Sequence, residues 1–448
     1  MFKRKVYDSL LEWKYKSAGK TAILLEGARR IGKTTVVKEF AKNEYEDYIF
    51  IDFSLPNNYI KNNFNNIGDL DTFFRNLFVY TKKVLTPRKG LIIFDEVQFF
   101  PLARQAIKHL VADGRFDYIE TGSLISINEN VKDILIPSEE KTIQMFPMDF
   151  EEFLWANGNI VFADVIRQAF NDKKSLGKDI HSTIMKTFRT YIAVGGMPQA
   201  VEAYVKGKDY LSIDDVKQDI LNLYYKDIKK YDNKNDGKTS STFNMLASSL
   251  SNHNSIFKLS KVNKNARYRE YRNSFNFLEE SMMVNICYNI TSPEVIMELY
   301  CEKDKFKMYM GDTGLLISLI LNSEPNNANN LYASLISGDL SINEGIIFEN
   351  MVAQMLRANK HQLYFHEFLY TPKDTSTEKK YEVDFLLING KRITPIEVKS
   401  SNFRSHKSFD YFKDKYKLKL PEKYIIYTKD FKYEDNIYYI PIYMTICL

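Results

Sequence analysis

Residues 24–40 read LLEGARRIGKTTVVKEF, and this stretch has the spacing of a phosphate-binding loop. Gly27, four further residues and then Gly32-Lys33-Thr34 satisfy the pattern G-x-x-x-x-G-K-[ST], between an apolar strand pattern and a helical one. Glycines let backbone N–H groups face phosphate oxygens, and the start of a helix adds positive potential. We expect Lys33 to reach the β- and γ-phosphates of ATP and Thr34 to offer its hydroxyl to Mg²⁺. The predicted nucleotide-binding residues here are Gly27, Gly32, Lys33, Thr34 and Thr35.

Two acids follow a second apolar strand about sixty residues later, in LIIFDE at 91–96. Ligands of open α/β sheets bind where strands end. Asp95 is therefore predicted to hold Mg²⁺ through water, and Glu96 to orient and deprotonate the attacking water. The next strand, YIETGSL at 118–124, would place Thr121 and Ser123 beside Asp95 if the strand order is simple. Thr121 could then sense the γ-phosphate, or it could belong to an ordinary Thr-Gly turn.

The composition is that of a globular chain of several domains. Its 448 residues predict about two to four domains, and it is 44% hydrophobic and 27% charged. The net charge of +5 permits an anionic partner without requiring one. The cysteines, Cys287, Cys301 and Cys447, have no CxxC spacing and suit a reducing compartment. The charged start does not predict a signal peptide, and no window predicts a membrane span, so we expect a cytoplasmic protein without a membrane partner.

The pattern of elements divides the chain. Short apolar strands alternate with helical stretches up to about residue 150, which predicts a parallel sheet covered by helices. A mostly helical stretch follows. Polar segments at 230–241 and 321–330 resemble linkers. Between them, helices followed by a strand predict a winged-helix domain.

Basic residues gather in the expected winged-helix segment, with Tyr268 and Tyr271 among them. A basic stripe with aromatic residues suits a nucleic-acid backbone. The alternative is a solvated helix surface beside a core face that contains Phe275 and Leu278. The residues predicted to contact nucleic acid are Lys264, Arg267, Arg269 and Arg272.

Near the C-terminus, EVDFLLINGKRITPIEVKSS at 382–401 contains Asn389-Gly390 between apolar strands, a strong hairpin signal. A two-residue turn pairs Ile388 with Lys391, which puts Asp384, Glu397 and Lys399 on one face. The two carboxylates, roughly 5–8 Å apart, could then share a divalent ion that activates water, while Lys399 stabilises developing charge. Glu349, on a preceding helix, could add a third carboxylate. The alternative is a half-exposed hairpin with a salt bridge to Lys399.

The ordered segments GARRIGKTT, LIIFDEVQ, TGSL, FPMDFEEFL, VGGMPQAV, KMYMGDTGL, EGIIFENMVA and EVDFLL…IEVKSS resemble a bacterial and archaeal family of AAA-type P-loop ATPases. Its C-terminal half is a domain of unknown function. The resemblance implies an α/β protein with an AAA-type ATPase core at 1–160, a winged-helix-like domain at 236–325 and a restriction-endonuclease-like domain of the PD-(D/E)xK kind at 326–448. The mostly helical stretch between the first two, at 161–235, is interpreted as a helical lid. Many relatives carry Gly-Arg before the PMDF segment, whereas this chain reads IPSEEKTIQMF, so an arginine finger is left unassigned.

These features predict an ATPase with ATP and Mg²⁺ as cofactors, whose nucleotide state controls a DNA- or RNA-directed module. The catalytic residues would be Lys33 and Glu96 for ATP, and Asp384, Glu397 and Lys399 for a nuclease reaction. The alternative is an ATP-dependent switch or scaffold whose nuclease-like domain does not cleave and binds a protein partner. Assembly into a homo-oligomer is compatible with either.

Overall fold

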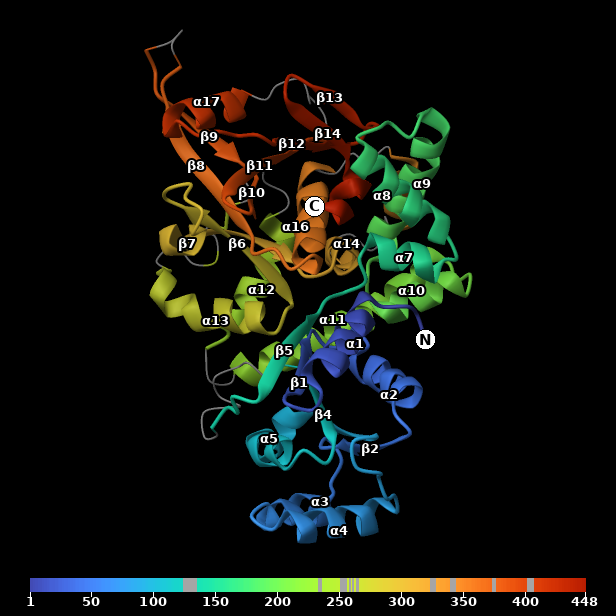
Figure 1. The fold of residues 1–448 in the computed structure, drawn as a ribbon. Coiled ribbons are helices and arrows are strands. Elements are labelled where there is room, and N and C mark those ends of the chain that lie inside the picture. The colour runs from blue at the N-terminus through green and yellow to red at the C-terminus, as the bar shows by residue number, and fades with distance from the viewer. Residues whose placement is uncertain are drawn as a thin grey trace. The chain divides into compact units, whose positions relative to one another are not determined.

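A computed structural model describes residues 1–123, 135–232, 236–249, 256, 257, 259, 262, 266–322, 328–338, 344–372, 376–400 and 407–448 (Figure 1). The chain forms two compact units. The first contains residues 1–146 and 280–282, and the second contains residues 147–279 and 283–448. Apart from residues 280–282, the three segments expected after residue 160 thus lie within one unit.

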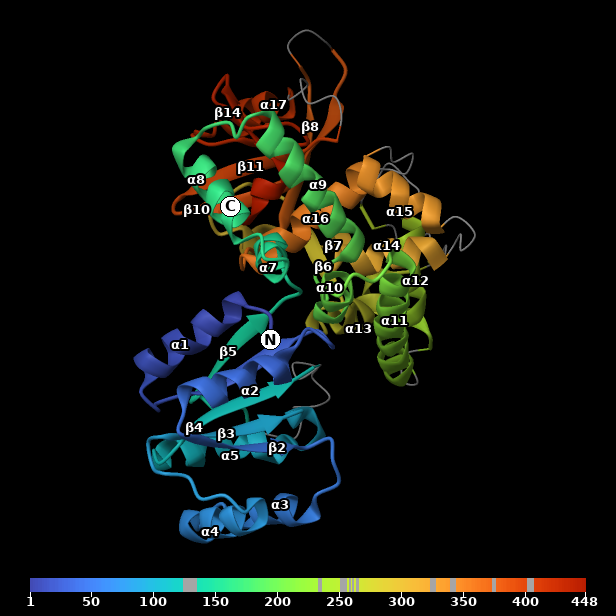
Figure 2. The same ribbon diagram turned by 90° about the vertical axis from the view of Figure 1, so that its right-hand side faces the viewer.

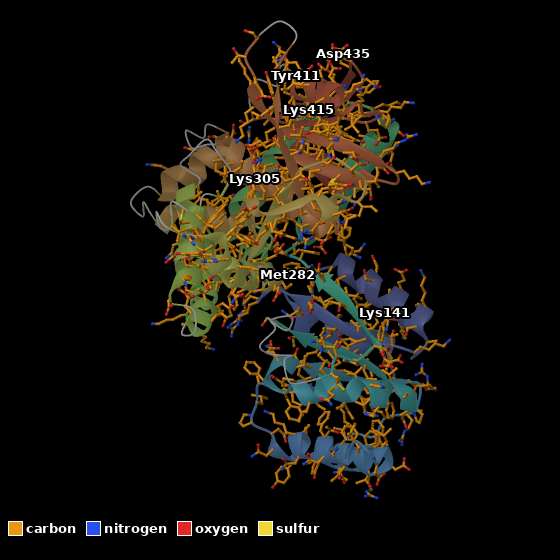
Figure 3. All side chains as sticks on the ribbon, turned by 90° about the vertical axis from the view of Figure 1, so that its left-hand side faces the viewer. Lys141, Met282, Lys305, Tyr411, Lys415 and Asp435 are labelled. Atoms are coloured by element: carbon orange, nitrogen blue, oxygen red, sulfur yellow. The ribbon has the colours of Figure 1, made fainter. Side chains whose placement is uncertain are left out.

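The first unit contains a five-stranded, fully parallel sheet in the order β2-β3-β4-β1-β5. The strands are β1 (Ala22–Gly27), β2 (Asp47–Asp52), β3 (Gly90–Asp95), β4 (Asp117–Gly122) and β5 (Glu140–Met145). This confirms the parallel sheet predicted from the alternating pattern. The sequence did not indicate β5, because it is an edge strand with exposed charges such as Lys141 (Figure 3).

Helices cover both faces of this sheet (Figure 2). They are α1 (Lys5–Ser17), α2 (Lys33–Glu44), α3 (Asn58–Asn63), α4 (Leu70–Thr81) and α5 (Pro101–Asp113). On the α3–α5 side, Phe53, Phe64, Phe73 and Phe94 belong to one aromatic-rich core. Strands buried on both faces carry continuous apolar runs rather than alternation. Every residue of β3 is buried, which explains its continuous apolar run.

The second unit begins with helices and continues with two sheets. Its helices are α7 (Phe150–Ala156), α8 (Ile160–Asp172), α9 (Lys178–Val194), α10 (Pro198–Val205), α11 (Tyr210–Asp232), α12 (Lys238–Ser249), α13 (Tyr268–Glu280), α14 (Thr313–Asn322), α15 (Ala328–Ser337), α16 (Glu344–Ala358) and α17 (Lys407–Tyr416). A capping box between Asp149 and Glu152 starts α7 by satisfying two backbone N–H groups.

One sheet joins the expected middle and C-terminal segments. Its order is β7-β6-β8-β9, from β6 (Val284–Ile290), β7 (Cys301–Met310), β8 (Tyr364–Tyr370) and β9 (Lys379–Val383). Strands β6 and β7 are antiparallel, and β8 pairs with β6 in parallel (Figure 1). The other sheet has the order β10-β11-β12-β14-β13. Its strands are β10 (Phe385–Asn389), β11 (Arg392–Val398), β12 (Tyr424–Tyr427), β13 (Lys432–Glu434) and β14 (Ile437–Pro441).

Two of the sequence segments quoted above, VGGMPQAV and KMYMGDTGL, meet inside the second unit. Asp312 accepts hydrogen bonds from the backbone N–H groups of Gly196, at 2.6 Å, and Leu315, at 3.0 Å. A Cβ atom added to Gly196 would lie 2.1 Å from the carbonyl oxygen of Met148, and one added to Gly314 would lie 2.5 Å from that of Val194. Only glycine permits such close backbone approach, so these two segments pack the helices of this unit together.

Candidate functional site

The loop between β1 and α2 has the backbone shape that phosphate binding requires. Gly32 has a φ of 92° and immediately precedes the first helical residue, Lys33. A Cβ atom on Gly27 would lie 2.4 Å from the carbonyl oxygen of Met145. Glycine is therefore needed at both ends of the loop, once for its conformation and once for space. The loop ends at the N-terminus of a twelve-residue helix, where N–H groups are free of intrahelical partners.

Lys33 is held by neutral groups. Its Nζ donates to the carbonyl oxygens of Gly27, at 2.8 Å, and Ala28, at 3.0 Å. Burial lowers the pKa of Lys33 to about 8, although Glu96 and Asp95 act in the opposite direction. Because no carboxylate binds this ammonium at hydrogen-bond distance among the described residues, phosphate oxygens could replace the two carbonyl partners without breaking an ion pair.

Three polar side chains from three elements meet beside Lys33. The hydroxyl of Thr34 lies 3.0 and 3.1 Å from the two carboxylate oxygens of Asp95. Thr121 donates its hydroxyl to Oδ1 of the same carboxylate. Burial raises the pKa of Asp95, while these hydroxyls oppose the rise. Since β3 pairs with β4, the expected neighbourhood of Asp95 and Thr121 is confirmed. A hydroxyl and a carboxylate in this arrangement suit hydrated Mg²⁺.

The remaining predicted residues lie around this group in different settings. Glu96 follows Asp95 directly, has a left-handed backbone with a φ of 56°, and accepts a hydrogen bond from Gln98. Its side chain is half-buried. Ser123 is buried, whereas Thr35 is exposed on α2.

The C-terminal hairpin forms, but the predicted register was wrong. Asn389 pairs with Arg392 and Ile388 with Ile393, so the turn residues are Gly390 and Lys391. Gly390, with a φ of 61°, is thus the first of the two turn residues, whereas a turn centred on Asn389-Gly390 would make it the second. Each residue of β10 pairs with a residue two positions further along β11 than predicted. Because side chains alternate with a period of two, the residues predicted to share a face of the hairpin still share it.

Asp384 lies at a point that the sequence did not indicate, between β9 and β10, where the chain leaves one sheet and enters the other. Its Oδ2 atom accepts a hydrogen bond of 2.8 Å from the backbone N–H of Val398, on β11. The junction thereby ties Asp384 to the strand that carries Glu397.

An unanticipated lysine lies among these acids. Nζ of Lys307, on β7, is 2.6 Å from a carboxylate oxygen of Glu382, 3.5 Å from one of Glu349 and 3.8 Å from one of Asp384. Burial lowers the pKa of Lys307, but Glu349 and Glu382 outweigh that effect and hold it well above its usual range. Sequence reasoning missed Lys307 and Glu382 because neither belongs to the acid–acid–lysine spacing.

Glu397 and Lys399 form a second ion pair. Nζ of Lys399 is 2.8 Å from Oε2 of Glu397, so a buried carboxylate is paired with a half-buried ammonium. Burial raises the pKa of Glu397 to about 7, with Lys399 opposing the rise. Burial also raises the pKa of Glu349, which Lys307 opposes and Asp384 reinforces.

These side chains do not present an open metal site. Within the residues that the structure describes, no group of three or more His, Cys, Asp or Glu side chains is placed to hold a metal ion. The acids predicted to do so, Glu349, Asp384 and Glu397, instead surround two ammonium groups. The donor set is appropriate for a hard divalent ion, but Lys307 occupies the position between Glu349 and Asp384.

The predicted nucleic-acid residues are partly described. Arg269 and Arg272 are exposed on α13, and Arg267 is exposed just before it. Lys264 lies outside the described residues. The adjacent side of the helix buries Tyr271 and Phe275. A basic exposed face therefore lies beside a core face on this helix.

The parallel sheet, its phosphate-binding loop and the acids after β3 define the first unit as an AAA-type P-loop ATPase fold. Residues 19–154 match the model of a family described as AAA domain. Residues 185–326 match a domain of unknown function (DUF8612), and residues 344–445 match another (DUF4143). The winged-helix and restriction-endonuclease-like assignments are not among these descriptions.

Solved structures show only a distant likeness. They include the Aeropyrum pernix ORC2 protein in its ADP form (13% identity, 75% of this chain and 93% of that chain, TM-score 0.26). A RuvB protein of Thermotoga maritima has 12% identity over 63% of this chain and 89% of that chain (TM-score 0.28). AMPPCP-bound DnaA from Aquifex aeolicus has 11% identity over 62% and 88% (TM-score 0.25). No curated protein sequence matches this chain. Among the helices that the structure describes, none is long and apolar enough to span a membrane.

Proposed function

We propose that this chain binds ATP with Mg²⁺ and hydrolyses it at the loop between β1 and α2. The observation that carries this proposal is the hydrogen-bonded group of Thr34, Asp95 and Thr121 beside the buried ammonium of Lys33. A hydroxyl, a carboxylate and an ammonium at the N-terminus of a helix are the groups that phosphoryl transfer uses.

Each residue has a distinct role in this proposal. Backbone N–H groups between Gly27 and Gly32 cradle the phosphates, and Lys33 exchanges its two carbonyl partners for β- and γ-phosphate oxygens. Mg²⁺ would be held by Thr34 and, through water, by Asp95, and it would neutralise charge on the phosphates. Glu96 takes a proton from the attacking water.

Phosphate release by the purified chain tests the proposal. Wild type should release phosphate from ATP in Mg²⁺ and not in EDTA. Asp95→Asn should lower the rate at least tenfold, by the loss of a charged metal partner, whereas Asp71→Asn, at a highly exposed carboxylate, should not. Equal rates for wild type and Asp95→Asn would contradict the assignment.

We further propose that the second unit contacts nucleic acid through α13. Two observations support this: Arg269 and Arg272 share an exposed side of the helix, and α13 leads into the antiparallel β6–β7 pair, an order typical of winged helices. Labelled duplex and single-stranded DNA and RNA should bind, with affinities that fall as salt rises. Binding that does not respond to salt would argue against this surface.

A second candidate for the C-terminal module is a non-cleaving switch or scaffold that binds a protein partner. The ion pairs of Lys307 favour it, because they occupy the acids that a nuclease would use for metal. Incubation of wild type with plasmid, ATP and Mg²⁺ or Mn²⁺ separates the two. The switch predicts intact plasmid in every condition, and nicking that Asp384→Ala removes would restore the nuclease.

A further inference from the structure

Both the side chain and the backbone of Lys307 are enclosed by the second unit. Its side chain is fully buried. On one side β7 pairs its residue with Cys287 of β6, and on the other side it forms a bridge with Ile256. Backbone partners flank Lys307 on both sides and fix the position of its Cα atom, so the ammonium can move away from the acids only through its own side-chain torsions or a shift of β7.

The acids around this ammonium come from separate elements. Glu349 lies on α16, Glu382 on β9 and Asp384 between β9 and β10. The ring of Phe365, on β8, lies 5.2 Å from Nζ and adds a further favourable contact for a cation. Tyr309, two residues along β7, donates its hydroxyl to Glu349 at 3.0 Å. The fold therefore converges three carboxylates on one point and places a positive charge there.

Carboxylate oxygens are the ligands that a hard divalent ion prefers, although within the described residues these three are not placed to hold one. A divalent ion drawn to Glu349 and Asp384 would lie within a few ångströms of the ammonium in a buried, weakly screened setting, where like charges repel strongly. Lysine and metal are therefore alternatives at this position.

We propose that Lys307 is the resident cation of this acidic cluster and takes the place of a divalent metal ion, so that the acid–acid–lysine motif holds no metal while β7 remains paired. The ammonium comes from β7, in the segment before the C-terminal module, and it pairs with carboxylates of that module. The proposal does not depend on ATP hydrolysis or on nucleic-acid binding.

The test replaces Lys307 by a neutral side chain of similar length, Lys307→Met. Melting temperatures are measured without nucleotide, in EDTA and in Mn²⁺. We expect Mn²⁺ to raise the Tm of the variant by about 5 °C when it is present at ~100 times its Kd, and to leave wild type unchanged. The double variant Lys307→Met/Asp384→Asn should lose most of that rise.

Lys305→Met is a matched control, because Lys305 (labelled in Figure 3) lies two positions earlier on β7 and forms an ion pair with Glu367 rather than with the acidic cluster. It should show no rise with Mn²⁺. A Lys307→Met chain that folds only in Mn²⁺ supports the proposal, and one that Mn²⁺ neither stabilises nor folds overturns it. A measurement on wild type does not depend on whether a variant folds. If wild type binds Mn²⁺ in the absence of nucleotide, and Asp384→Asn or Glu397→Gln removes that binding, the proposal is overturned.

Discussion

Two buried lysines occupy the two candidate sites, and their surroundings differ in kind. Lys33 contacts two backbone carbonyls, which are neutral, whereas Lys307 contacts three carboxylates. The first can exchange its partners for phosphate without separating charges. The second cannot leave without bringing three half-buried carboxylates to face one another unpaired, which is costly. The partners in the free protein thus distinguish the two lysines. Neutral partners suit a lysine that binds a ligand, and carboxylate partners suit a lysine that takes the place of a bound cation.

Replacing Lys33 should have the largest effect. Lys33→Ala removes the buried ammonium that contacts the carbonyl oxygens of Gly27 and Ala28, and ATP hydrolysis should fall at least ~100-fold through lost charge stabilisation. Phosphate release in Mg²⁺ measures it. Lys42→Ala, on the exposed side of the same helix, should retain the wild-type rate. Unchanged hydrolysis in Lys33→Ala would end the comparison, since neither lysine would then serve a ligand.

Glu96→Gln should separate binding from chemistry at the same site. The amide cannot accept the proton of the attacking water, so hydrolysis should fall about 100-fold or more. A fluorescent ATP analogue should still bind, because Lys33, Thr34 and Asp95 remain. Loss of binding together with hydrolysis would assign Glu96 to the structure of the site rather than to catalysis.

The pH dependence of stability tests the surroundings of Glu397, in the site that contains Lys307. Its pKa is raised to about 7 by burial, so the folded chain binds a proton there that the unfolded chain has released. Its contribution to stability is present below the unfolded pKa and is lost as pH rises through the folded one. Between pH 5 and pH 8, wild type should therefore lose stability relative to Glu397→Gln, by ~3 kcal/mol at most.

Denaturant melts at both pH values measure this difference. The exposed Glu378→Gln variant is the control and should follow wild type. A difference that grows in the opposite direction would show that the Lys399 ammonium, rather than burial, dominates the setting of Glu397.

The smallest expected effect concerns α13. Arg269→Ala and Arg272→Ala should each weaken DNA binding by about tenfold or less and reduce the slope of log affinity against log salt by about 1. Fluorescence anisotropy at several salt concentrations measures both quantities. Arg75→Ala, exposed on α4 in the other unit, should change neither. A wild-type slope in both variants would leave α13 as a solvated surface.

The nucleotide site could be predicted from sequence because its parts are local. Glycine spacing fixes the loop, and the acids follow a strand that is apolar throughout, so Asp95 and Thr121 needed only neighbouring strands to meet. The hairpin shows where local reasoning ends. Asn389-Gly390 indicated a turn correctly, but the pairing of Asn389 with Arg392 depends on the strands around it.

Lys307 could not be predicted, for a physical reason. Nothing in the spacing of β7 shows that both faces of its second half are buried, and a buried ammonium is acceptable only because Glu349, Glu382 and Asp384 lie 42, 75 and 77 residues later. In the sequence, Lys307 is only the first residue of the segment KMYMGDTGL, and nothing around it indicates an ion pair. Long-range ion pairs of this kind become visible when strands from two segments share a sheet.

Mn²⁺ binding by wild type, followed by electron paramagnetic resonance with and without ATP, tests the contrast between the two lysines most directly. The account predicts one tightly bound Mn²⁺ per chain when ATP is present, lost in Lys33→Ala, and none without nucleotide. A tightly bound Mn²⁺ in nucleotide-free protein, removed by Asp384→Asn, would contradict it, because Lys307 would then not fill the acidic cluster.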